Sequence, residues 1–367
     1  MRIGIDAHFV GVRRSGNEQY FENLIRALLR QPADGSEYFV FSYRGAAQAC
    51  LPDPRAVHVP LSSRSVWWQR AIEIPRHAWR LGLDLVHVPF NFLPIMKCRT
   101  VVTIHDLGFL RVPEVYTPAE RLRMRVLTRL SARWADHVVT GSDFTKRDIV
   151  EEYALPPERV SVAPSAVDPT VFRPLAPAER DAARRRLGLA EEYLLFVGVI
   201  QPRKNLGVLI DALAALRARA WPNLQLVLAG REGFRAADVF GRARERSVEQ
   251  AVRHVGVVSD ADLVALYNGA RAFVYPSIFE GFGIPLLEAM SCGCPVVSSN
   301  ATSLPEVYGD AALSFDPADT DALIARLEEL LGDAALRQRL AERGVERAAQ
   351  FSWDRTAAIV RRAYAAA

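Results

Sequence analysis

The chain has 367 residues, of which 50% are hydrophobic and 24% charged, and its formal net charge at pH 7 is +4. At roughly 150 residues per domain this length predicts two domains, and the composition is that of an ordinary globular protein. No run reaches the roughly 18 uncharged apolar residues that span a bilayer. Asp6 interrupts the apolar stretch at the N-terminus, which therefore lacks a signal-peptide pattern. We expect a cytoplasmic protein.

The four cysteines are too few and too scattered to form a disulfide framework. Cys292 and Cys294 flank a single glycine, but no second Cys or His pair stands near them in the sequence. A metal site at this point is therefore the weaker interpretation, and packed, reduced thiols are the better one.

The positive charge is unevenly distributed. Residues 1–172 hold 22 Lys and Arg against 18 Asp and Glu, whereas the remaining residues hold 24 of each sign. Five arginines of the first part share one segment whose apolar residues have helical spacing: Arg121, Arg123, Arg125, Arg129 and Arg133. This segment is either a solvated helix face or a surface attracted to an anionic membrane or an acidic acceptor. No nucleic-acid-binding motif accompanies it, so we expect no nucleic-acid partner.

In chain order, short apolar and β-branched runs alternate with amphipathic stretches. The first half predicts helices at 19–30 and 118–134, and strands at 3–6, 38–42, 85–88, 101–104 and 137–140. Alternation of strand and helix is typical of a mainly parallel, doubly wound sheet.

The alternation restarts after a stretch that contains four prolines and reads as a linker: Pro164, Pro169, Pro174 and Pro177. The second half predicts strands at 193–197, 225–229, 252–255, 272–275, 295–298 and 312–315, and helices at 206–219, 260–269, 285–291 and 320–331. The prediction is therefore an α/β fold with two doubly wound, Rossmann-like domains at 1–172 and 173–350. Such sheets bind ligands beyond the carboxyl ends of their strands, and two facing sheets would enclose a cleft.

Three places in the first half carry special residues just past a predicted strand. Residues 11–16 contain glycines at both ends, which suit either an anion-binding loop or a flexible turn. His105 and Asp106 follow the strand at 101–104, where a histidine can contact a sugar hydroxyl or serve a structural role. Ser142 precedes a helix, so it is at least an N-cap candidate and could also face the cleft.

Arg203 and Lys204 stand in the turn between a strand and a helix of the second half. Lysine occurs only three times in the chain, and one of the three lies beside an arginine at this turn. A guanidinium offers several N–H donors in one plane, and an ammonium offers a concentrated positive charge. The pair therefore suits a diphosphate.

Glu280 and Glu288 flank a Gly-rich loop and a helix start. Pro285 favours the first helical turn, whose free N–H groups can bind an anion. A carboxylate accepts two hydroxyl groups well, so Glu288 suits a ribose diol and Glu280 a hexose. The plainer interpretation is that Glu280 caps the helix and Glu288 is a surface charge. The apolar residues around Glu288 argue against it.

These motifs resemble those of retaining glycosyltransferase family four, which has the GT-B fold. The likeness rests mainly on Arg203-Lys204-Asn205, on Pro276-Ser277, and on the Glu280 and Glu288 motif. Weaker matches lie around His105-Asp106, at Thr140-Gly-Ser142 and at Phe351-Ser-Trp353, so the resemblance covers nearly the whole chain.

The resemblance implies transfer of a hexose from a nucleotide diphosphate sugar to a glycan or lipid-linked saccharide, with retention at the anomeric carbon. Arg203 and Lys204 would neutralise the leaving diphosphate, Glu280 would orient the sugar, and Glu288 would bind the ribose. The resemblance also implies a catalytic role for His105, beside the donor sugar's hydroxyls. The remaining donor contacts that it implies are Gly16, Ser142, Gly198, Val258, Phe282, Gly283 and Ile284. A final helix within 351–367 would return to the first domain. Cation clamps can stabilise leaving-group charge, so we expect no metal and no cofactor besides the donor.

The sugar is less constrained than the reaction. His105-Asp106-Leu107 followed by Pro113-Glu114 looks like mannosyl- and rhamnosyl-transferring relatives of surface-polysaccharide assembly, so GDP-mannose is the first hypothesis and a UDP-hexose the second. Many family members carry Arg where Val199 stands, which leaves phosphate contact more dependent on Arg203 and Lys204. A nucleotide-sugar epimerase, an NAD-dependent oxidoreductase and a catalytically silent GT-B partner subunit stay as alternatives.

Overall fold

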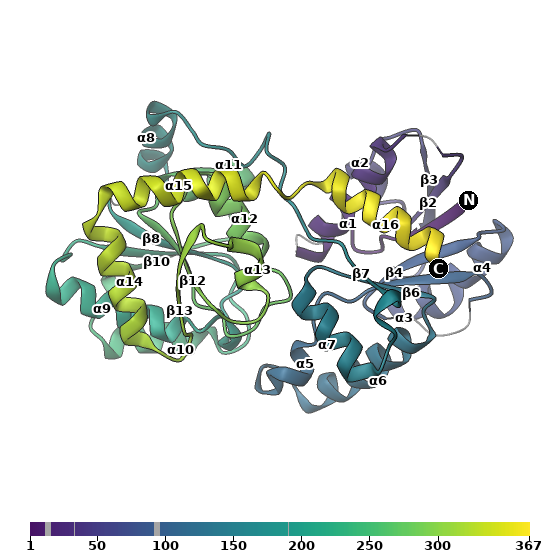
Figure 1. The fold of residues 1–367 in the computed structure, drawn as a ribbon, viewed down its shortest axis with the longest axis horizontal. Helices are drawn as coiled ribbons and strands as arrows, with labels where there is room; N and C mark the ends of the chain where they lie inside the picture. Colours follow the sequence, from purple (N-terminus) through teal and green to yellow (C-terminus); the bar gives the residue numbers. More distant parts are fainter. Residues whose placement is uncertain (12–15, 33, 92–95, 190) are drawn as a thin grey trace. The chain divides into compact units, whose positions relative to one another are not determined.

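The computed structural model describes residues 1–11, 16–32, 34–91, 96–189 and 191–367 (Figure 1). The chain packs into two compact units. Unit 1 comprises Met1–Ser165 together with Ser352–Ala367, and unit 2 comprises Ala166–Phe351. The chain therefore leaves unit 1 once and contributes its last residues to it again.

Unit 1 is built on a seven-stranded sheet in which the strands of the described residues pair in parallel. The order is β3-β2-β1-β4-β5-β6-β7. The strands are β1 (Arg2–Asp6), β2 (Glu37–Tyr43), β3 (Ala56–Leu61), β4 (Leu85–Pro89), β5 (Arg99–Thr103), β6 (His137–Thr140) and β7 (Val160–Val162). The sequence order reverses between β1 and β4, so the topological switch point of this sheet lies there.

The helices of unit 1 connect these strands. They are α1 (Gly16–Arg30), α2 (Ala47–Cys50), α3 (Val66–Trp68), η1 (Gln69–Glu73), α4 (Ile74–Arg80), α5 (Gly108–Arg111), η2 (Pro113–Val115), α6 (Pro118–Trp134), α7 (Asp143–Tyr153), η3 (Pro157–Arg159) and α16 (Trp353–Ala366). Local sequence sets several starts. Thr117 and Glu120 form a capping box at α6, for example, and satisfy N–H groups that lack an intrahelical partner.

Unit 2 holds a six-stranded sheet with the order β10-β9-β8-β11-β12-β13, again with parallel pairs. Its strands are β8 (Tyr193–Val197), β9 (Gln225–Ala229), β10 (Val252–Gly256), β11 (Ala272–Tyr275), β12 (Val296–Ser299) and β13 (Ala312–Phe315). Leu194, Leu195 and Phe196 are all fully buried. Consecutive residues point to opposite faces, so both faces of β8 are covered, which explains its unbroken apolar run.

The helices of unit 2 follow the strands in the same alternating manner. They are α8 (Pro177–Arg186), η4 (Pro202–Lys204), α9 (Leu206–Arg219), α10 (Ala236–Glu245), η5 (Glu249–Ala251), α11 (Asp260–Gly269), α12 (Ile284–Ser291), α13 (Leu304–Tyr308), α14 (Thr320–Gly332) and α15 (Ala334–Ala348). Residues that follow β8, β11 and β12 lie at one edge of the sheet, because the carboxyl ends of parallel strands share an edge.

The last helix, α16, packs on α1, β6 and β7 of unit 1 (Figure 1). Ser352 caps it by accepting a hydrogen bond from Arg355 N. Near its end, the hydroxyl of the fully buried Tyr364 lies 2.8 Å from His87 Nδ1 on β4. These contacts make α16 a structural part of unit 1.

The α/β class with two doubly wound parallel sheets is confirmed. The strands and long helices expected from the sequence are present, with bounds that differ by a few residues, whereas β3 and β7 were not expected. No helix in the described part of the chain is both long and apolar enough to cross a membrane.

Candidate functional site

The turn after β8 presents Arg203 and Lys204. Gly198 begins this turn with a φ of +147°, and a Cβ there would lie 3.2 Å from the Phe196 ring and 3.7 Å from Lys204 Cε. A side chain at this position would therefore be strained and would press on the Phe196 ring. The short helix η4 then carries both basic residues, and Asn205 ends it by donating from Nδ2 to Pro317 O at 2.8 Å.

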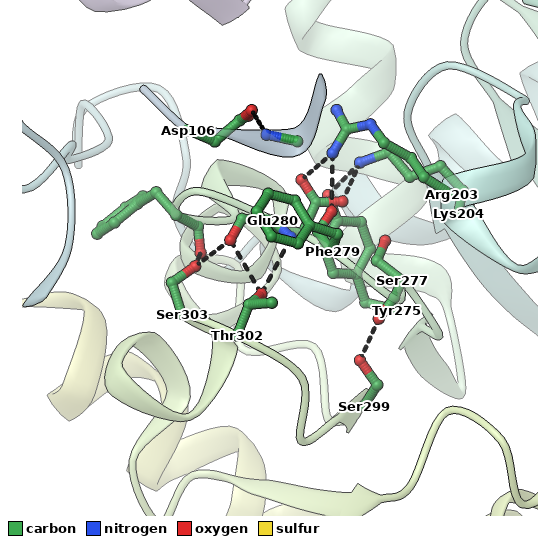
Figure 2. A network of polar contacts seen from close by, with 12 residues as sticks. Asp106, Arg203, Lys204, Tyr275, Ser277, Phe279, Glu280, Ser299, Thr302 and Ser303 are labelled. Carbon is green, nitrogen blue, oxygen red and sulfur yellow. Dashed lines mark hydrogen bonds and ion pairs between the residues drawn. The ribbon is translucent and has the colours of Figure 1, made fainter. Parts of the chain in front are cut away.

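Both basic side chains bind the carboxylate of Glu280 (Figure 2). Arg203 donates from one terminal nitrogen to Glu280 Oε2 and to the carbonyl of Phe279, each at 2.9 Å. Lys204 Nζ donates to Glu280 Oε1 at 2.5 Å and to the hydroxyl of Tyr275 at 2.7 Å. Lys204 is 5% exposed and Glu280 6%, so this is a buried ionic network held by charge-assisted hydrogen bonds.

The electrostatics of the network keep Glu280 ionised. Burial alone would raise the pKa of its carboxyl, but the charges of Arg203 and Lys204 and their hydrogen bonds outweigh burial and lower that pKa to about 2. Two cations therefore share one carboxylate, and the network of these three side chains carries a net positive charge.

The backbone around Glu280 is fixed by the loop after β12. Thr302 Oγ1 accepts from Glu280 N at 3.0 Å and donates to Glu280 O at 2.9 Å, while Ser303 Oγ donates to the same carbonyl at 2.9 Å. Thr302 has a φ of +53°, an uncommon conformation for a β-branched residue. Ile278 N also donates to Arg203 O at 2.9 Å, which ties the Glu280 loop to the Arg203 turn.

Glu288 lies inside α12 and is 5% exposed, so the interpretation as a surface charge is wrong. It accepts a hydrogen bond from the hydroxyl of Tyr267 on α11 at 2.9 Å. Burial, together with the charge of Glu288 and its hydrogen bond, raises the pKa of Tyr267 well above its ordinary value, so this hydroxyl stays protonated and donates.

The loop before α12 has the form expected of a binding turn. Gly283 is the N-cap of α12, with a φ of +106°, and a Cβ there would lie 2.8 Å from Leu304 Cδ2. Glycine is therefore required at this position, and Glu280 is not the cap. Phe282 and Ile284 flank Gly283 and are partly buried against the core of unit 2. The first N–H groups of such a helix lack intrahelical partners and suit an anion or a hydroxyl oxygen.

Unit 1 holds His105 directly after β5. Burial lowers the pKa of His105 to about 4, so its imidazole is neutral at physiological pH. Its Nε2 has no hydrogen-bond partner among the described residues, and its ring packs edge-on against Tyr20 and Phe90, with centroids 5.0 and 5.5 Å apart. The side chain of Asp106 accepts from Gly108 N at 2.8 Å and so shapes the following turn.

The other expected contacts have simpler surroundings. Ser142 is the N-cap of α7, as the sequence predicts, and accepts from Thr145 N at 3.1 Å. Gly16 is the exposed first residue of α1, and the preceding loop residues 12–15 lie outside the described residues. Val258 follows β10 and is partly buried against the core of unit 2. Gly16, His105 and Ser142 thus belong to unit 1, and the remaining expected contacts to unit 2.

Within the described residues, no group of three or more His, Cys, Asp or Glu side chains could hold a metal ion. Cys292 and Cys294 are buried free thiols, and burial raises the pKa of Cys292 to about 12. Two Asp-x-Asp sequences open helices: 260–262 forms the first turn of α11, and Asp319 of the sequence 319–321 caps α14. Acidic residues at helix N-termini are favourable there for electrostatic reasons.

Four residues of this site were not expected from the sequence: Tyr267, Tyr275, Thr302 and Ser303. Two of them carried a usable signal. Tyr275 is the last residue of β11, and Thr302 stands in a polar loop directly after β12, both at the carboxyl edge of the sheet. Tyr267 lies within an ordinary apolar helix, so only the structure shows its contact with Glu288.

Comparisons with known proteins identify the family of this chain. Residues 179–347 match the family described as glycosyl transferases group 1, and residues 14–171 match glycosyltransferase family 4. The O-antigen chain mannosyltransferase B of Escherichia coli is 39% identical over 291 residues, which cover 78% of this chain and 76% of that protein. The chain belongs to this glycosyltransferase family. It is a hexosyltransferase.

A second relative and two solved structures extend the comparison. The serotype-specific mannosyltransferase WbdA of E. coli is 32% identical over 281 residues, which cover 74% of this chain but 34% of that protein. Anabaena Alr3699/HepE in complex with UDP-glucose has a TM-score of 0.79 at 19% identity and full coverage of both chains. WaaG, a glycosyltransferase involved in lipopolysaccharide biosynthesis, has a TM-score of 0.76 at 20% identity, covering 99% of this chain and 98% of that one. These two likenesses show the fold, which is GT-B.

Proposed function

We propose that this glycosyltransferase moves mannose from GDP-mannose to a glycan or lipid-linked saccharide, with retention at the anomeric carbon. The choice of sugar is supported by the relatives, whose names describe mannosyltransferases. The observation that carries the reaction is the network in which Arg203 and Lys204 are both held on Glu280.

The network supports departure of a diphosphate. In the transition state negative charge grows on the leaving phosphate, and preorganised cations stabilise this charge without rearranging. Glu280 keeps Arg203 and Lys204 in place before the donor arrives, and both side chains carry charge of the sign that attracts a diphosphate. The leaving phosphate then takes part in deprotonating the acceptor on the same face of the sugar.

The donor's other parts are assigned by burial and chemistry. Glu288, inside α12, binds the ribose diol, and the backbone around Gly283 orients the hexose together with Glu280. The base lies along the segment that ends at Val258, and Gly198 gives the phosphates room. Unit 2 is thus the donor-binding domain and unit 1 the acceptor-binding domain.

A screen of nucleotide sugars tests this function. The full chain is incubated with GDP-mannose, UDP-glucose, UDP-galactose or dTDP-rhamnose, with and without α-linked mannobiose as acceptor. We expect GDP-mannose to raise the melting temperature most, because a ligand that binds only the folded state stabilises it. We also expect GDP release that depends on acceptor and an α-linked product by NMR. Nucleotide release or donor conversion that ignores the acceptor would indicate a hydrolase or an epimerase instead.

The role of the cations is tested by Lys204→Ala. Loss of one preorganised charge is expected to lower kcat/KM for the donor about 10²-fold or more, as loss of a single transition-state contact does elsewhere. A variant with near-normal kcat/KM and intact folding would show that charge neutralisation does not depend on this residue.

The donor screen also tests the alternative of a catalytically silent partner subunit. If the wild type binds none of the nucleotide sugars, that alternative is favoured.

We further propose that α6 brings the enzyme to the cytoplasmic face of a membrane as a peripheral protein. Arg121, Arg123, Arg125 and Arg129 are exposed on this helix. Leu122, at 64% exposure, and Val126, at 47%, are exposed between them. Cationic side chains interleaved with exposed apolar ones are typical of helices that bind anionic lipid surfaces.

Vesicle sedimentation tests this contact. The wild type is expected to pellet with phosphatidylglycerol vesicles but not with phosphatidylcholine vesicles, and to be released by salt, because each nearby cation contributes about 1 kcal/mol. Arg121→Glu with Arg125→Glu should abolish pelleting. The matched control, Arg339→Glu with Arg343→Glu on the exposed face of α15, should not. Equal pelleting of both double variants would show that α6 is not the membrane contact.

A further inference from the structure

A polar cluster that the donor site does not use lies at the topological switch point of unit 1. Asp6 is the last residue of β1, and Asn91 follows β4 by two residues. His8 follows Asp6 along the chain, and Arg70 comes from the π-helical turn η1. Doubly wound sheets bind ligands at this point, beyond the carboxyl ends of the strands that flank it.

The contacts within the cluster hold His8 in one orientation. His8 Nδ1 lies 2.8 Å from Asp6 Oδ1, and its backbone N–H donates to the same oxygen at 3.2 Å. Arg70 donates from Nε to Asp6 Oδ2 at 3.1 Å, from one terminal nitrogen to Asn91 Oδ1 at 3.1 Å, and from the other to the Pro89 carbonyl at 3.0 Å. Asp6 is fully buried and the Arg70 side chain is 9% exposed, so these groups form a rigid support.

The chemistry of this support shows that Nδ1 of His8 carries a proton. Burial by itself would raise the pKa of Asp6, but His8 and Arg70 outweigh it and hold this pKa well below its usual range. An ionised carboxylate only accepts hydrogen bonds, so Nδ1 of His8 must be the donor. Nε2 of His8 has no partner among the described residues and is therefore the ring nitrogen left for a ligand.

The charges of the support point to the class of ligand. The charge of Arg70 is offset by Asp6, and the three donor nitrogens of Arg70 are all bound to groups of the cluster. A hydroxyl group both donates and accepts hydrogen bonds, so it suits the Nε2 atom of His8. His8 is partly exposed, with 12% of its side chain accessible, so a ligand can reach it.

The neighbourhood of the cluster supports a role beside the reaction. Phe90, the residue between β4 and Asn91, has a φ of +65°, an uncommon conformation that clusters at functional sites. Its ring packs against His105, with centroids 5.5 Å apart. The π-helical turn that supplies Arg70 is likewise a form found mostly at functional sites. Phe90 therefore connects Asn91 of the cluster, its neighbour in the chain, with the proposed donor-sugar contact His105.

We infer that His8, oriented by Asp6 and Arg70, binds a hydroxyl group of the acceptor saccharide through Nε2. This inference rests on the proposed function, since it names the part of unit 1 that recognises the glycosyl acceptor. It assigns His8 a binding role at the substrate and assigns Asp6 and Arg70 positioning roles.

Kinetics of the full chain test the inference, with GDP-mannose as donor and α-linked mannobiose as acceptor. His8→Ala should raise KM for mannobiose about 10-fold, the effect of removing one hydrogen bond to a buried site. GDP-mannose binding and GDP release without acceptor should stay within about twofold of the wild type. His58→Ala, which removes a histidine of the edge strand β3 whose Nε2 contacts Leu51 O, is the matched control and should leave KM unchanged.

A set of mono-deoxy mannobioses makes the test specific. One of them should lose about 10-fold in kcat/KM with the wild type but nothing further with His8→Ala, because the hydroxyl and the imidazole contribute to the same bond. If every deoxy analogue loses equally with both enzymes, or if His8→Ala leaves KM unchanged, the assignment of His8 is overturned.

A readout without turnover separates this inference from the proposed function. In the 15N spectrum of the histidine side chains, His8 should show a protonated Nδ1, and mannobiose should shift the Nε2 signal of His8 alone. A wild type that transfers no sugar but shows this shift would overturn the proposed donor chemistry and keep the acceptor contact. A wild type that transfers mannose without any shift at His8 would overturn the contact and keep the function.

Discussion

The two carboxylates of the donor motif have different partners in unit 2. Glu280 is bound by two cations, whereas Glu288 accepts a hydrogen bond from a neutral tyrosine hydroxyl. A carboxylate held by cations is placed to organise phosphate charge, whereas a carboxylate can accept the hydroxyl groups of a diol. From this difference we propose that Glu280 acts mainly in turnover and Glu288 mainly in donor affinity.

We therefore expect Glu288→Ala to weaken donor binding about 10-fold or more, and to do so more than Glu280→Ala, which should mainly lower kcat. Removal of the carboxylate also leaves the hydroxyl of Tyr267 buried without this acceptor, at a cost of about 1–3 kcal/mol of stability. Calorimetric titration of GDP-mannose and steady-state kinetics of both variants check the order. Tyr267→Phe is the control for the stability effect. The opposite order of donor affinities would refute the division of roles.

The network also predicts a pH dependence of stability. The pKa of Glu280 falls from its ordinary 4.5 to about 2 in the folded chain, because Arg203 and Lys204 outweigh the effect of burial. The stabilisation that the ionised carboxylate provides is therefore present above pH 4.5 and is lost as the pH falls through about 2.

Melting temperatures of the wild type and Glu280→Gln between pH 7 and pH 3 measure how much the ionised Glu280 stabilises the fold at each pH. The wild type should be the more stable at pH 7, and the gap between the two should stay constant down to about pH 5 and narrow below 4.5. Other acids titrate equally in both proteins and cancel in the difference. A gap that stays constant to pH 3 would mean that Glu280 has an ordinary pKa.

At the residue scale, the sequence predicts those site residues whose side chains are unusual for their surroundings. Arg203, Lys204, Glu280 and Glu288 are charged residues beside apolar strands or helices, and the structure buries both glutamates and the lysine. The partners that hold them, such as Tyr275 and Thr302, are of common type and come from distant parts of the chain. Their role depends on which strand ends are neighbours, and this follows from the order β8-β11-β12, which no local pattern contains.

At the scale of elements, the two unexpected strands, β3 and β7, are both edge strands. β3 contains Pro60 and exposes 46% of Val57, and β7 is only three residues long. A strand with one neighbour tolerates proline and polar residues, so its sequence loses the unbroken apolar run of a central strand. Central strands such as β8 are buried on both faces, and their sequences predict them well.

The helix α16 contributes a buried polar contact to unit 1. Its Tyr364 hydroxyl lies 2.8 Å from His87 Nδ1, and Thr103 Oγ1 lies 2.7 Å from the other nitrogen of this imidazole. Burial lowers the pKa of His87 to about 3, so the ring is neutral and needs one donor and one acceptor partner. The helix therefore closes unit 1 through polar as well as apolar contacts.

Two substitutions of Tyr364 separate these contributions. Tyr364→Phe keeps the ring and leaves His87 Nδ1 without this partner, so it should destabilise the chain by about 1–3 kcal/mol. Tyr364→Ala adds a cavity and should cost about 3–5 kcal/mol. The control Tyr43→Phe removes only a contact with the exposed Arg64 and should change stability by less than about 0.5 kcal/mol. Urea unfolding measures all three, and equal effects of Tyr364→Phe and Tyr43→Phe would exclude the buried hydrogen bond.

At the scale of the whole molecule, the two units differ in the number of chain segments that form them. Unit 2 is one continuous segment, Ala166–Phe351, and contains its own core together with Arg203, Lys204, Glu280 and Glu288. Unit 1 is made of two segments, and its second segment supplies the buried side chains of Trp353, Val360 and Tyr364. The two units should therefore behave differently when the chain is cut at their boundaries.

We predict that residues 166–351 expressed alone unfold cooperatively and bind GDP, because the segment contains both a complete sheet and the cation pair. Residues 1–165 alone should be unstable, since the surface that α16 covers is exposed. Addition of a synthetic peptide of residues 352–367 should restore cooperative unfolding at one equivalent, and the same peptide with Tyr364→Ala should not. Circular dichroism during urea titration, with calorimetry for GDP, gives the readout. If residues 1–165 unfold as cooperatively without the peptide as with it, α16 is dispensable. If residues 166–351 fold but do not bind GDP, nucleotide binding requires residues of unit 1.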